Sequence, residues 1–333
     1  MTDLPAFGTE FGSTMAVSRW ADEAWSVPTR DPVAPLSLHP AAHVLHYGSS
    51  CFEGLKAHRG LDERVRIFRL DRHVARMQAS ADRLCLPVPN RDMLTSMVVD
   101  TVEANLDRVP EPPGSLYIRP TLIGTAPNIG AAGSPTTEAT MFILTSPVGE
   151  YFAGGLKPLR IGVETRTPRT TPQFGSVKTG ANYAMALGVT MEAKRNYGVA
   201  QVLFAPGGEV QETGASNVLL LDDDRVITPM LDGSFLEGVT RDSVLVLATD
   251  MGMDVVERSL TVGDLLEWAA HGEVALSGTA AILAPVGTLV VDGEHVRVGS
   301  GQVGETTLAL RQALIDVQIA KAPDVHGWTT PVG

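Results

Sequence analysis

Apolar residues in the first half of the chain follow two periods. Residues 73–84 carry Val74, Met77 and Leu84 on or near one face of a helix, and residues 93–106 are a second helix candidate. Around them stand short apolar runs of the kind that forms buried strands. These strands are expected at residues 65–68, 116–118 and 139–144.

The second half continues the alternation with more strands. Helices are expected at residues 182–195 and 241–249, and a loop rich in threonine and proline at residues 166–173. Two hairpins are expected, one around a Pro-Gly-Gly turn and one around a turn of three aspartates. The strands are predicted at residues 159–163, 200–204, 209–212, 218–221, 226–228 and 273–276.

A cluster of proline and glycine separates the two halves. Residues 146–158 read SPVGEYFAGGLKP, a composition that is typical of an interdomain linker. A chain of 333 residues is also longer than one compact core normally needs. We therefore predict an α/β fold with two unlike domains. A small N-terminal domain would cover residues 1–147, a linker residues 148–158, and a larger domain residues 159–333.

The composition is that of a soluble globular protein. The hydrophobic fraction is 44% and the charged fraction 19%, and the net charge of −12 disfavours nucleic acid and anionic membranes as partners. No basic segment followed by an apolar run opens the chain, so no signal peptide is expected. Glycine and proline interrupt the longest apolar stretch, residues 274–291, which predicts two strands or a strand and a helix but no membrane span.

Few residues suggest metal or redox chemistry. Cys51 and Cys85 leave a single disulfide open, but no cysteine or histidine spacing is typical of a metal site. We therefore expect no metal and a reduced, cytoplasmic compartment. The chain also lacks the motifs typical of nicotinamide enzymes, P-loop NTPases and zinc proteases.

Lys178 is the most informative of only five lysines. It lies in GSVKTGANYA, between a predicted loop and a predicted helix, with Gly175 and Gly180 nearby. Glycine-rich backbone permits the close approach of a ligand, and a lysine in a partly apolar pocket can attack a carbonyl group. Because most lysines face solvent, the residue alone leaves both interpretations open.

Two segments are suited to binding phosphate. Gly238, Val239 and Thr240 open a predicted helix, whereas Gly278 and Thr279 follow a predicted strand. Free N–H groups at a helix N-terminus attract anions, and threonine hydroxyls add donors. Plain N-capping would produce the same residue pattern.

Eight segments, in order along nearly the whole chain, resemble the branched-chain amino acid aminotransferases, which have fold type IV of the pyridoxal-phosphate enzymes. They are FGTEF, LHYGSSCFEGLKAHRG, LYIRPTLIGT, SPVGEYFAGG, VKTGANYA, ETGASN, LEGVTRDS and the stretch from ERSLTV to SGTAA. The resemblance implies transamination of branched-chain L-amino acids with 2-oxoglutarate. It also implies pyridoxal 5'-phosphate as the cofactor, bound between the two domains, and at least a homodimer.

The same resemblance implies roles for the cofactor residues. Lys178 matches the lysine that forms the Schiff base and exchanges the α-proton. Tyr183 matches the tyrosine at the phenolic oxygen, and Glu212 matches the carboxylate at the pyridine nitrogen, where it strengthens the ring as an electron sink. The phosphate contacts correspond to Arg76, Gly238, Val239, Thr240, Gly278 and Thr279.

Substrate contacts are implied at Phe11, Tyr47, Phe52, Tyr117, Arg119, Tyr151, Ala215 and Ala280. Aromatic walls suit an aliphatic side chain, and Arg119 with the tyrosine hydroxyls suits the second carboxylate of 2-oxoglutarate. The chain departs from the family at Ala181, Ala215 and Glu237, where relatives usually have glycine, threonine and proline. Ala281 and Ala284 stand where the mammalian enzymes have a redox CxxC, so no thiol switch is expected there.

Other functions on the same scaffold remain alternatives. They are a transaminase of specialised metabolism, a D-amino acid or (R)-amine transaminase, and an aminodeoxychorismate lyase. LYIRPTLIGT and SPVGEYFAGG favour the branched-chain class. A cofactor-binding protein without activity is a further alternative, which Lys178, Tyr183, Glu212 and Arg76 disfavour.

Overall fold

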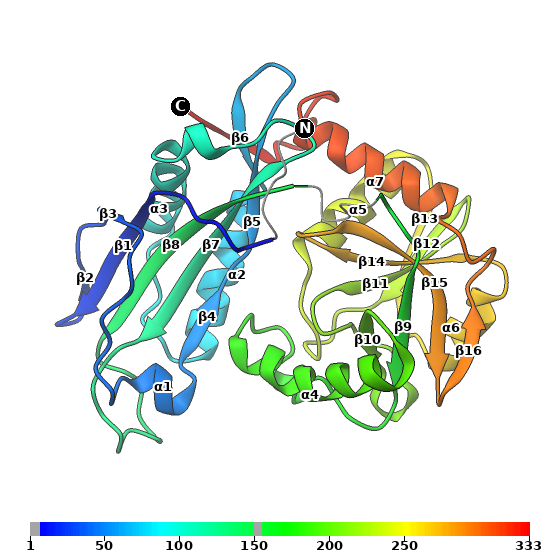
Figure 1. The fold of residues 1–333 in the computed structure, drawn as a ribbon, viewed down its shortest axis with the longest axis horizontal. Coiled ribbons are helices and arrows are strands. Elements are labelled where there is room, and N and C mark those ends of the chain that lie inside the picture. Colours follow the sequence, from blue (N-terminus) through cyan, green and yellow to red (C-terminus); the bar gives the residue numbers. More distant parts are fainter. Residues whose placement is uncertain (1–6, 150–154) are drawn as a thin grey trace. The chain divides into compact units, whose positions relative to one another are not determined.

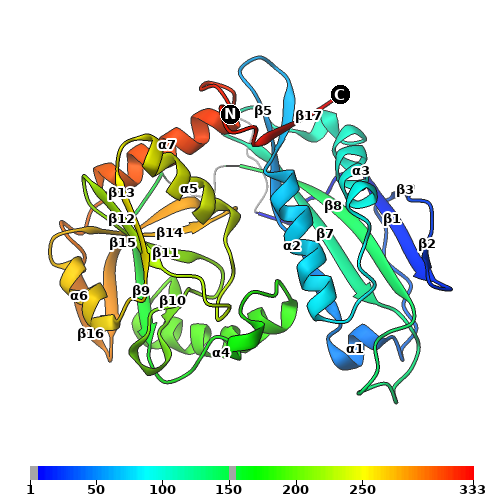
Figure 2. The same cartoon turned by 180° about the vertical axis from the view of Figure 1, so that it is seen from behind.

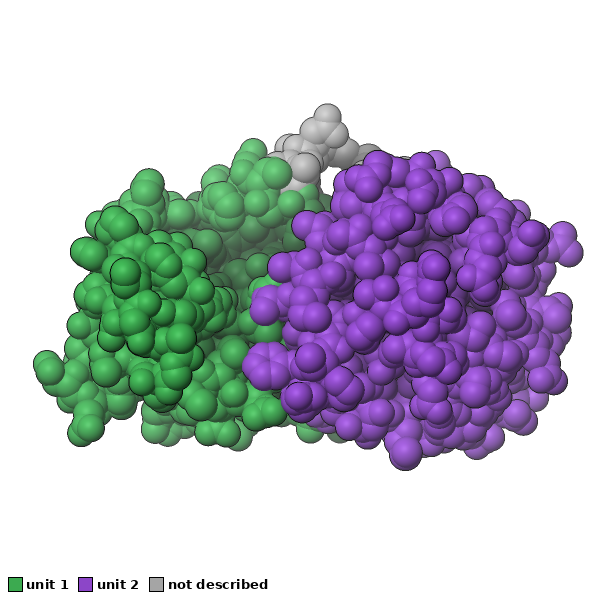
Figure 3. All heavy atoms as spheres, turned by 90° about the horizontal axis from the view of Figure 1, so that it is seen from below, with its two compact units in different colours: residues 1–151, 177–180, 317–333 green, residues 152–176, 181–316 purple. Residues whose placement is uncertain are grey.

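The chain forms two compact units. The computed structural model describes residues 7–149 and 155–333. Unit 1 consists of residues 1–151, 177–180 and 317–333, and unit 2 of residues 152–176 and 181–316 (Figure 3). Each unit is mixed α/β, as predicted. Lys178 thus belongs to the first unit, although the chain on either side of it belongs to the second. The domain boundaries expected near residues 147 and 159 stay a prediction.

Unit 1 is built on an antiparallel sheet of nine strands. The strand order is β17-β6-β5-β7-β8-β1-β2, with β3 paired to β1 and β4 paired to β7. Its strands are β1 (Thr14–Ala21), β2 (Ala24–Trp25), β3 (Thr29–Pro32), β4 (Ser50–Phe52), β5 (Leu55–Arg59), β6 (Val65–Phe68), β7 (Ser115–Gly124), β8 (Ala139–Val148) and β17 (Thr329–Val332). The unit also contains α1 (His43–Tyr47), α2 (Leu70–Arg83), α3 (Arg91–Glu103) and the 3₁₀ turn η1 (Leu106–Arg108).

Helices α2 and α3 cover one face of this sheet (Figures 1 and 2). Leu70, Val74, Met77 and Ala81 recur at helical spacing on α2 and are buried in the core of the unit. Two polar residues of the same helix, His73 and Ser80, are also buried. The inner face of α2 therefore carries polar groups as well as core residues.

Unit 2 is built on a mixed sheet of eight strands. The order is β10-β9-β15-β14-β11-β12-β13, with β16 paired to β15, and β9 runs parallel to both β10 and β15. The strands are β9 (Leu159–Glu164), β10 (Gln201–Phe204), β11 (Asn217–Leu221), β12 (Arg225–Pro229), β13 (Asp254–Arg258), β14 (Glu273–Gly278), β15 (Ile282–Val291) and β16 (Glu294–Arg297). The helices are η2 (Pro172–Phe174), α4 (Gly180–Tyr197), η3 (Pro206–Gly208), α5 (Val239–Asp250), α6 (Val262–Ala269) and α7 (Glu305–Gln318).

Alternating side chains of β10 face two different cores. Val202 and Phe204 pack with Ala186 of α4, whereas Leu203 packs with Leu265 in the cluster that includes α6. This period of two is the normal consequence of strand geometry. It explains how apolar residues of one strand can pack on both faces of the sheet, against α4 on one side and against the cluster with α6 on the other.

The structure corrects two local predictions. Residues 209–212 do not form a strand, because the Val210 N–H donates to Leu260 O while Gln211 and Glu212 each make one backbone hydrogen bond with Phe204. The break predicted from residue 146 begins too early, because residues 146–148 complete β8. The missing N–H of Pro147 is tolerated there because β1 pairs only with residues 139–143 of that strand.

The remaining predicted elements are found within four residues of their expected ends, apart from β7, which extends to Gly124. Residues 274–291 form parts of two strands, β14 and β15, which was one of the two expected outcomes. Among the described residues, no helix is both long and apolar enough to cross a bilayer.

Candidate active site

The backbone of Lys178 is fixed from two sides within unit 1. Its N–H donates to the Ser80 hydroxyl of α2 at 3.1 Å, and its carbonyl accepts the N–H of Phe52 at 3.0 Å. The next residue, Thr179, donates its hydroxyl to Ser50 O at 2.8 Å. The short segment 177–180 is therefore bound to both β4 and α2, which holds the lysine in place.

The Phe52 ring has two cations near it, Lys178 and Arg119. The Lys178 Nζ lies 5.2 Å from the centre of the Phe52 ring, and the Arg119 guanidinium lies 4.6 Å from the same ring. Arg119 Nη2 donates to the Tyr117 hydroxyl at 2.9 Å. The buried Nε of Arg119 has no hydrogen-bond partner among the described residues. This group brings together Lys178, Phe52, Tyr117 and Arg119, four of the residues that the sequence singled out.

A buried charge cluster lies beside this group. The Glu53 carboxylate receives Arg76 Nε at 2.7 Å and Nη2 at 2.9 Å, and His73 Nδ1 lies 2.6 Å from it. Burial acts to raise the pKa of Glu53, but the Arg76 and His73 contacts outweigh it and hold that pKa well below its usual range. Burial also lowers the pKa of His73, against the opposing effect of Glu53. Glu53 and His73 were not predicted from the sequence.

The other predicted substrate residues of this unit are more dispersed. Phe11 precedes β1, has an exposed side chain, and accepts a hydrogen bond from Arg108 on its carbonyl. Tyr47 ends α1, where its ring lies 4.8 Å from that of His43 and its hydroxyl bonds to Ile129 O. Tyr151 lies outside the described residues.

Glu212 is the buried carboxylate of unit 2. One of its oxygens lies 2.9 Å from Arg169 Nη2 and accepts the Leu236 N–H, also at 2.9 Å. The Asn217 amide lies 3.4 Å from the other oxygen. Glu212 and Arg169 are both 2% exposed, so this ion pair is shielded from water.

The loop that carries Arg169 is held by the start of α4. Thr170 donates its hydroxyl to Asn182 Oδ1 at 2.8 Å, and the Asn182 amide donates to Phe174 O at 2.9 Å. The same helix passes Gly214 at Ala186, one turn beyond the half-buried Tyr183. Sequence reasoning placed a loop here but missed Arg169, because an arginine between threonines and prolines carries no periodic signal.

The N-terminus of α5 has the features of an anion site. Its N-cap is Gly238, which offers no capping side chain, and Val239 and Thr240 form the first turn. A Cβ on Gly238 would lie 2.0 Å from Asn217 Oδ1, so only glycine fits. This close approach links the helix start to the residue that contacts Glu212.

The second predicted phosphate segment follows β14. Ser277 stands opposite Asn217 in the sheet, and its buried hydroxyl has no hydrogen-bond partner among residues 7–149 and 155–333. Gly278 approaches the Ala215 carbonyl, and Thr279 and Ala280 form the following turn. An unsatisfied hydroxyl, two glycines and an uncapped helix start fit a phosphate-bearing group.

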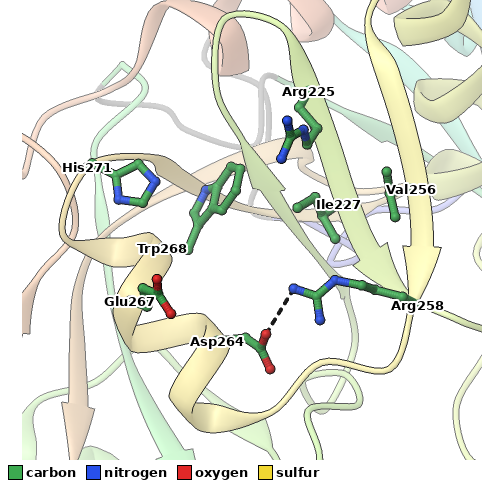
Figure 4. A pocket seen from close by; sticks show the side chains of 8 residues that line it. All are labelled: Arg225, Ile227, Val256, Arg258, Asp264, Glu267, Trp268 and His271. Carbon is green, nitrogen blue, oxygen red and sulfur yellow. Dashed lines mark hydrogen bonds and ion pairs between the residues drawn. The ribbon is translucent and has the colours of Figure 1, made fainter.

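A separate pocket of unit 2 lacks these features. About 320 Å³ in volume, it is lined by Arg225, Ile227, Val256, Arg258, Asp264, Glu267, Trp268 and His271 (Figure 4). Arg258 pairs with Asp264 at 2.9 Å, and Arg225 lies 3.5 Å from Asp254. Because both arginines of this pocket already pair with carboxylates, the pocket offers no strong site for an anion.

Comparison with known proteins identifies the family. The family described as amino-transferase class IV matches residues 50–288, more than half of the chain. The chain belongs to the class IV aminotransferases. It is 37% identical to branched-chain-amino-acid aminotransferase 2 of Bacillus subtilis (strain 168), a match that covers 98% of this chain and 92% of that protein. It is 39% identical to a probable branched-chain-amino-acid aminotransferase of Streptomyces coelicolor, over 97% of this chain and 91% of that one.

Solved structures agree with this assignment. The Escherichia coli branched-chain amino acid aminotransferase is similar to this class IV aminotransferase with a TM-score of 0.75 and 29% identity, over 96% of this chain and 100% of that one. Another branched-chain amino acid aminotransferase, solved with pyridoxamine 5'-phosphate, gives a TM-score of 0.78 at 28% identity, over 96% and 99% of the two chains. The predicted family, fold class and enzyme type are therefore confirmed.

Proposed function

We propose that this class IV aminotransferase moves the amino group of leucine, isoleucine or valine to 2-oxoglutarate, using pyridoxal 5'-phosphate bound to Lys178. The products are a branched-chain 2-oxo acid and L-glutamate. The main support is the surroundings of Lys178, whose backbone is fixed by Ser80 and Phe52 and whose amine lies beside an aromatic ring. The names of the relatives support the substrate class.

Residues of both units are assigned to the cofactor. Lys178 would bind it covalently, Glu212 would pair with the ring nitrogen, and Tyr183 would bond to the phenolic oxygen. The phosphate would be held by Arg76, Gly238, Val239, Thr240, Gly278 and Thr279. The unsatisfied Ser277 hydroxyl and the uncapped start of α5 support the phosphate assignment.

The chain's own groups account for the proton and charge movements. Bound pyridoxal phosphate supplies an aldehyde carbon and an electron-withdrawing ring. The Lys178 amine, in its neutral form, would be the base that takes the α-proton of the substrate and gives it up again. Glu212 would supply a negative charge to the ring nitrogen, and its ion pair with Arg169 at 2.9 Å would stabilise that charge.

The substrate contacts are assigned to the group around Arg119. Phe52 and Tyr117 would provide apolar surface for a branched side chain. The Arg119 Nε, which has no hydrogen-bond partner within the described parts of the chain, would donate to the second carboxylate of 2-oxoglutarate. Phe11, Tyr47, Tyr151, Ala215 and Ala280 complete the proposed set. The apolar side chain of the amino acid and the second carboxylate of 2-oxoglutarate would thus bind in the same site.

A homodimer in the cytoplasm is also proposed. Met185, Leu187 and Met191 expose apolar surface along α4, which association with a second copy would cover. Both cysteines are free thiols, which suits a reducing compartment. The mass of the protein in solution tests the dimer, and a monomer at micromolar concentration would contradict it.

The decisive experiment follows the absorbance of the bound cofactor. Adding L-leucine alone should convert the pyridoxal form to the pyridoxamine form, and 2-oxoglutarate should reverse the change. Lys178→Ala should abolish the conversion, whereas Lys194→Ala on the exposed face of α4 should leave it unchanged. A cofactor that ignores L-leucine but responds to another donor would refute the substrate assignment. Failure to bind pyridoxal phosphate would refute the proposal as a whole.

A further inference from the structure

Glu53 is a buried carboxylate to which the mechanism above gives no part. We propose that Glu53 is a positioning residue that fixes the Arg76 guanidinium where it binds the cofactor phosphate, and that it sets this position relative to Lys178. The inference rests on the proposed function, because it takes the phosphate role of Arg76 as given. It adds a residue that contacts neither the cofactor nor the substrate.

Consecutive residues connect the lysine to the arginine. The Phe52 N–H holds the Lys178 carbonyl, and the side chain of the next residue, Glu53, holds Arg76. On α2, Ser80 lies one helical turn after Arg76, and its hydroxyl accepts the Lys178 N–H. Lys178, the Phe52–Glu53 pair and α2 therefore form a closed loop of contacts. A shift of Arg76 would have to break one of these contacts.

The bond geometry suits orientation. Nε and Nη2 of Arg76 form one edge of a rigid, planar guanidinium, and both donate to the two oxygens of Glu53. This fork fixes the plane of the group as well as its place. His73 holds the Glu53 carboxylate in turn through Nδ1. Since Glu53 also offsets part of the Arg76 charge, its benefit to phosphate binding must come from orientation.

Apolar surroundings make this cluster rigid. Behind Glu53 and His73 lies a cavity of about 10 Å³, lined otherwise by apolar side chains that include Leu55, Met77 and Leu94. Glu53 is 1% exposed, so water does not weaken the ion pair. An arginine ordered in advance loses little side-chain entropy when a phosphate arrives. Without Glu53, that ordering would have to occur during binding.

The test compares two forms of the cofactor. The full chain is freed of cofactor, and its dissociation constants for pyridoxal 5'-phosphate and for pyridoxal, which lacks the phosphate, are measured by absorbance. Glu53→Gln keeps the shape of the side chain but removes its charge. We expect it to reduce the preference for the phosphorylated form by about 10-fold, the effect of a hydrogen bond to a charged group. Binding of pyridoxal itself should change little.

A matched ion pair provides the control. Asp62 also binds its arginine through two hydrogen bonds, from Arg66 Nη1 at 2.8 Å and Nη2 at 2.6 Å, but Asp62 is exposed. Asp62→Asn should leave both constants unchanged. Glu53→Asp retains the charge but is too short to reach both nitrogens, so an intermediate preference is expected, and this variant carries the test if Glu53→Gln does not fold.

Two results would overturn the inference. If Glu53→Gln weakens the binding of both compounds by one common factor, its role is structural only. If the preference is the same as in the original protein, Glu53 does not position Arg76. A protein that binds no pyridoxal phosphate before any substitution would instead overturn the proposed function, and this inference with it.

Discussion

A buried glutamate paired with an arginine lies in each unit, and the two pairs differ in how many hydrogen bonds join the two side chains. In unit 1, Arg76 gives two nitrogens to Glu53, and His73 completes the cluster. In unit 2, Arg169 reaches Glu212 through Nη2, while its buried Nε and Nη1 have no hydrogen-bond partner in the described parts of the chain. The first pair is arranged to fix a cation and the second to stabilise an anion. In the proposed function, the glutamate of the first pair supports its arginine, whereas the arginine of the second pair supports its glutamate.

The supporting elements differ in the same way. Arg76 and His73 stand on α2, whose packing against the sheet fixes both. Arg169 stands on a loop that depends on the Thr170–Asn182 and Asn182–Phe174 hydrogen bonds. Precise orientation needs a regular element, whereas charge stabilisation acts over a longer range and tolerates a loop.

The largest effect is expected from breaking the pair in unit 2. Glu212→Gln leaves the Arg169 cation buried without an anion, which should destabilise the chain by about 3–5 kcal/mol. Turnover should also fall by about 100-fold, as is typical for a lost electrostatic contact at a reacting centre. Thermal unfolding and single half-reactions measure the two effects separately. Glu209→Gln, at a partly exposed position near β10, is the control.

A double variant separates stability from chemistry. Arg169→Met should destabilise the protein by a similar amount, but Arg169→Met with Glu212→Gln removes both charges and should recover most of the stability. Its turnover should stay low because the ring nitrogen still lacks its carboxylate. If turnover recovered along with stability, Glu212 would not be the partner of the ring nitrogen.

A medium effect is expected from replacing either of two glycines, Gly238 near Glu212 and Gly54 next to Glu53, by alanine. A Cβ on Gly238 would lie 2.0 Å from Asn217 Oδ1, and a Cβ on Gly54 would lie 2.0 Å from the Tyr117 hydroxyl. Gly238→Ala should therefore weaken cofactor binding by about 10-fold, whereas Gly54→Ala should raise the KM for the amino acid by a similar factor. Titration with pyridoxal phosphate and steady-state kinetics distinguish the two.

Gly188→Ala is the control for both glycine variants, because a Cβ there meets no atom within 4 Å and alanine favours a helix. It should change neither constant. If Gly54→Ala altered cofactor affinity and left KM unchanged, Tyr117 would not belong to the substrate surface.

The contrast between the pairs also explains what the sequence could predict. The apolar spacing in residues 73–84 predicted a helix, which is confirmed as α2, and the short apolar run at residues 273–276 predicted a strand, which is confirmed as β14. Lys178 and Glu212 were predicted as cofactor residues from the resemblance to a family, and their roles stay a prediction. Glu53, His73 and Arg169 were missed, because a buried charge is defined by a partner far away in the sequence. The strand predicted at residues 209–212 was wrong for the same reason. The Val210 N–H bonds to Leu260 O, a partner that no local pattern reveals.

An effect confined to low pH is expected from acid, and it should originate in unit 1. His58 on β5 is buried, and its Nε2 has no hydrogen-bond partner among the described residues. Burial and the charge of Lys56 lower the pKa of His58 to about 3, from 6.5 in an unfolded chain. Between these two values the unfolded chain binds one more proton than the folded chain, so stability falls as pH falls from 6.5 towards 3. The full difference is on the order of a few kcal/mol.

His58→Leu should therefore flatten the decline in stability between about pH 6.5 and about pH 4, measured from denaturant midpoints of the full chain. The flattening should be incomplete, because the lowered pKa of His73 acts in the same direction. Glu53, also in unit 1, loses its stabilising charge only below the usual carboxyl range, since its pKa is lowered too. His295→Leu, on the exposed strand β16, is the matched control and should keep the original profile. Equal flattening in both variants would mean that acid sensitivity does not arise from the buried histidine. Flattening in His58→Leu alone would assign the acid sensitivity to the buried histidine of unit 1.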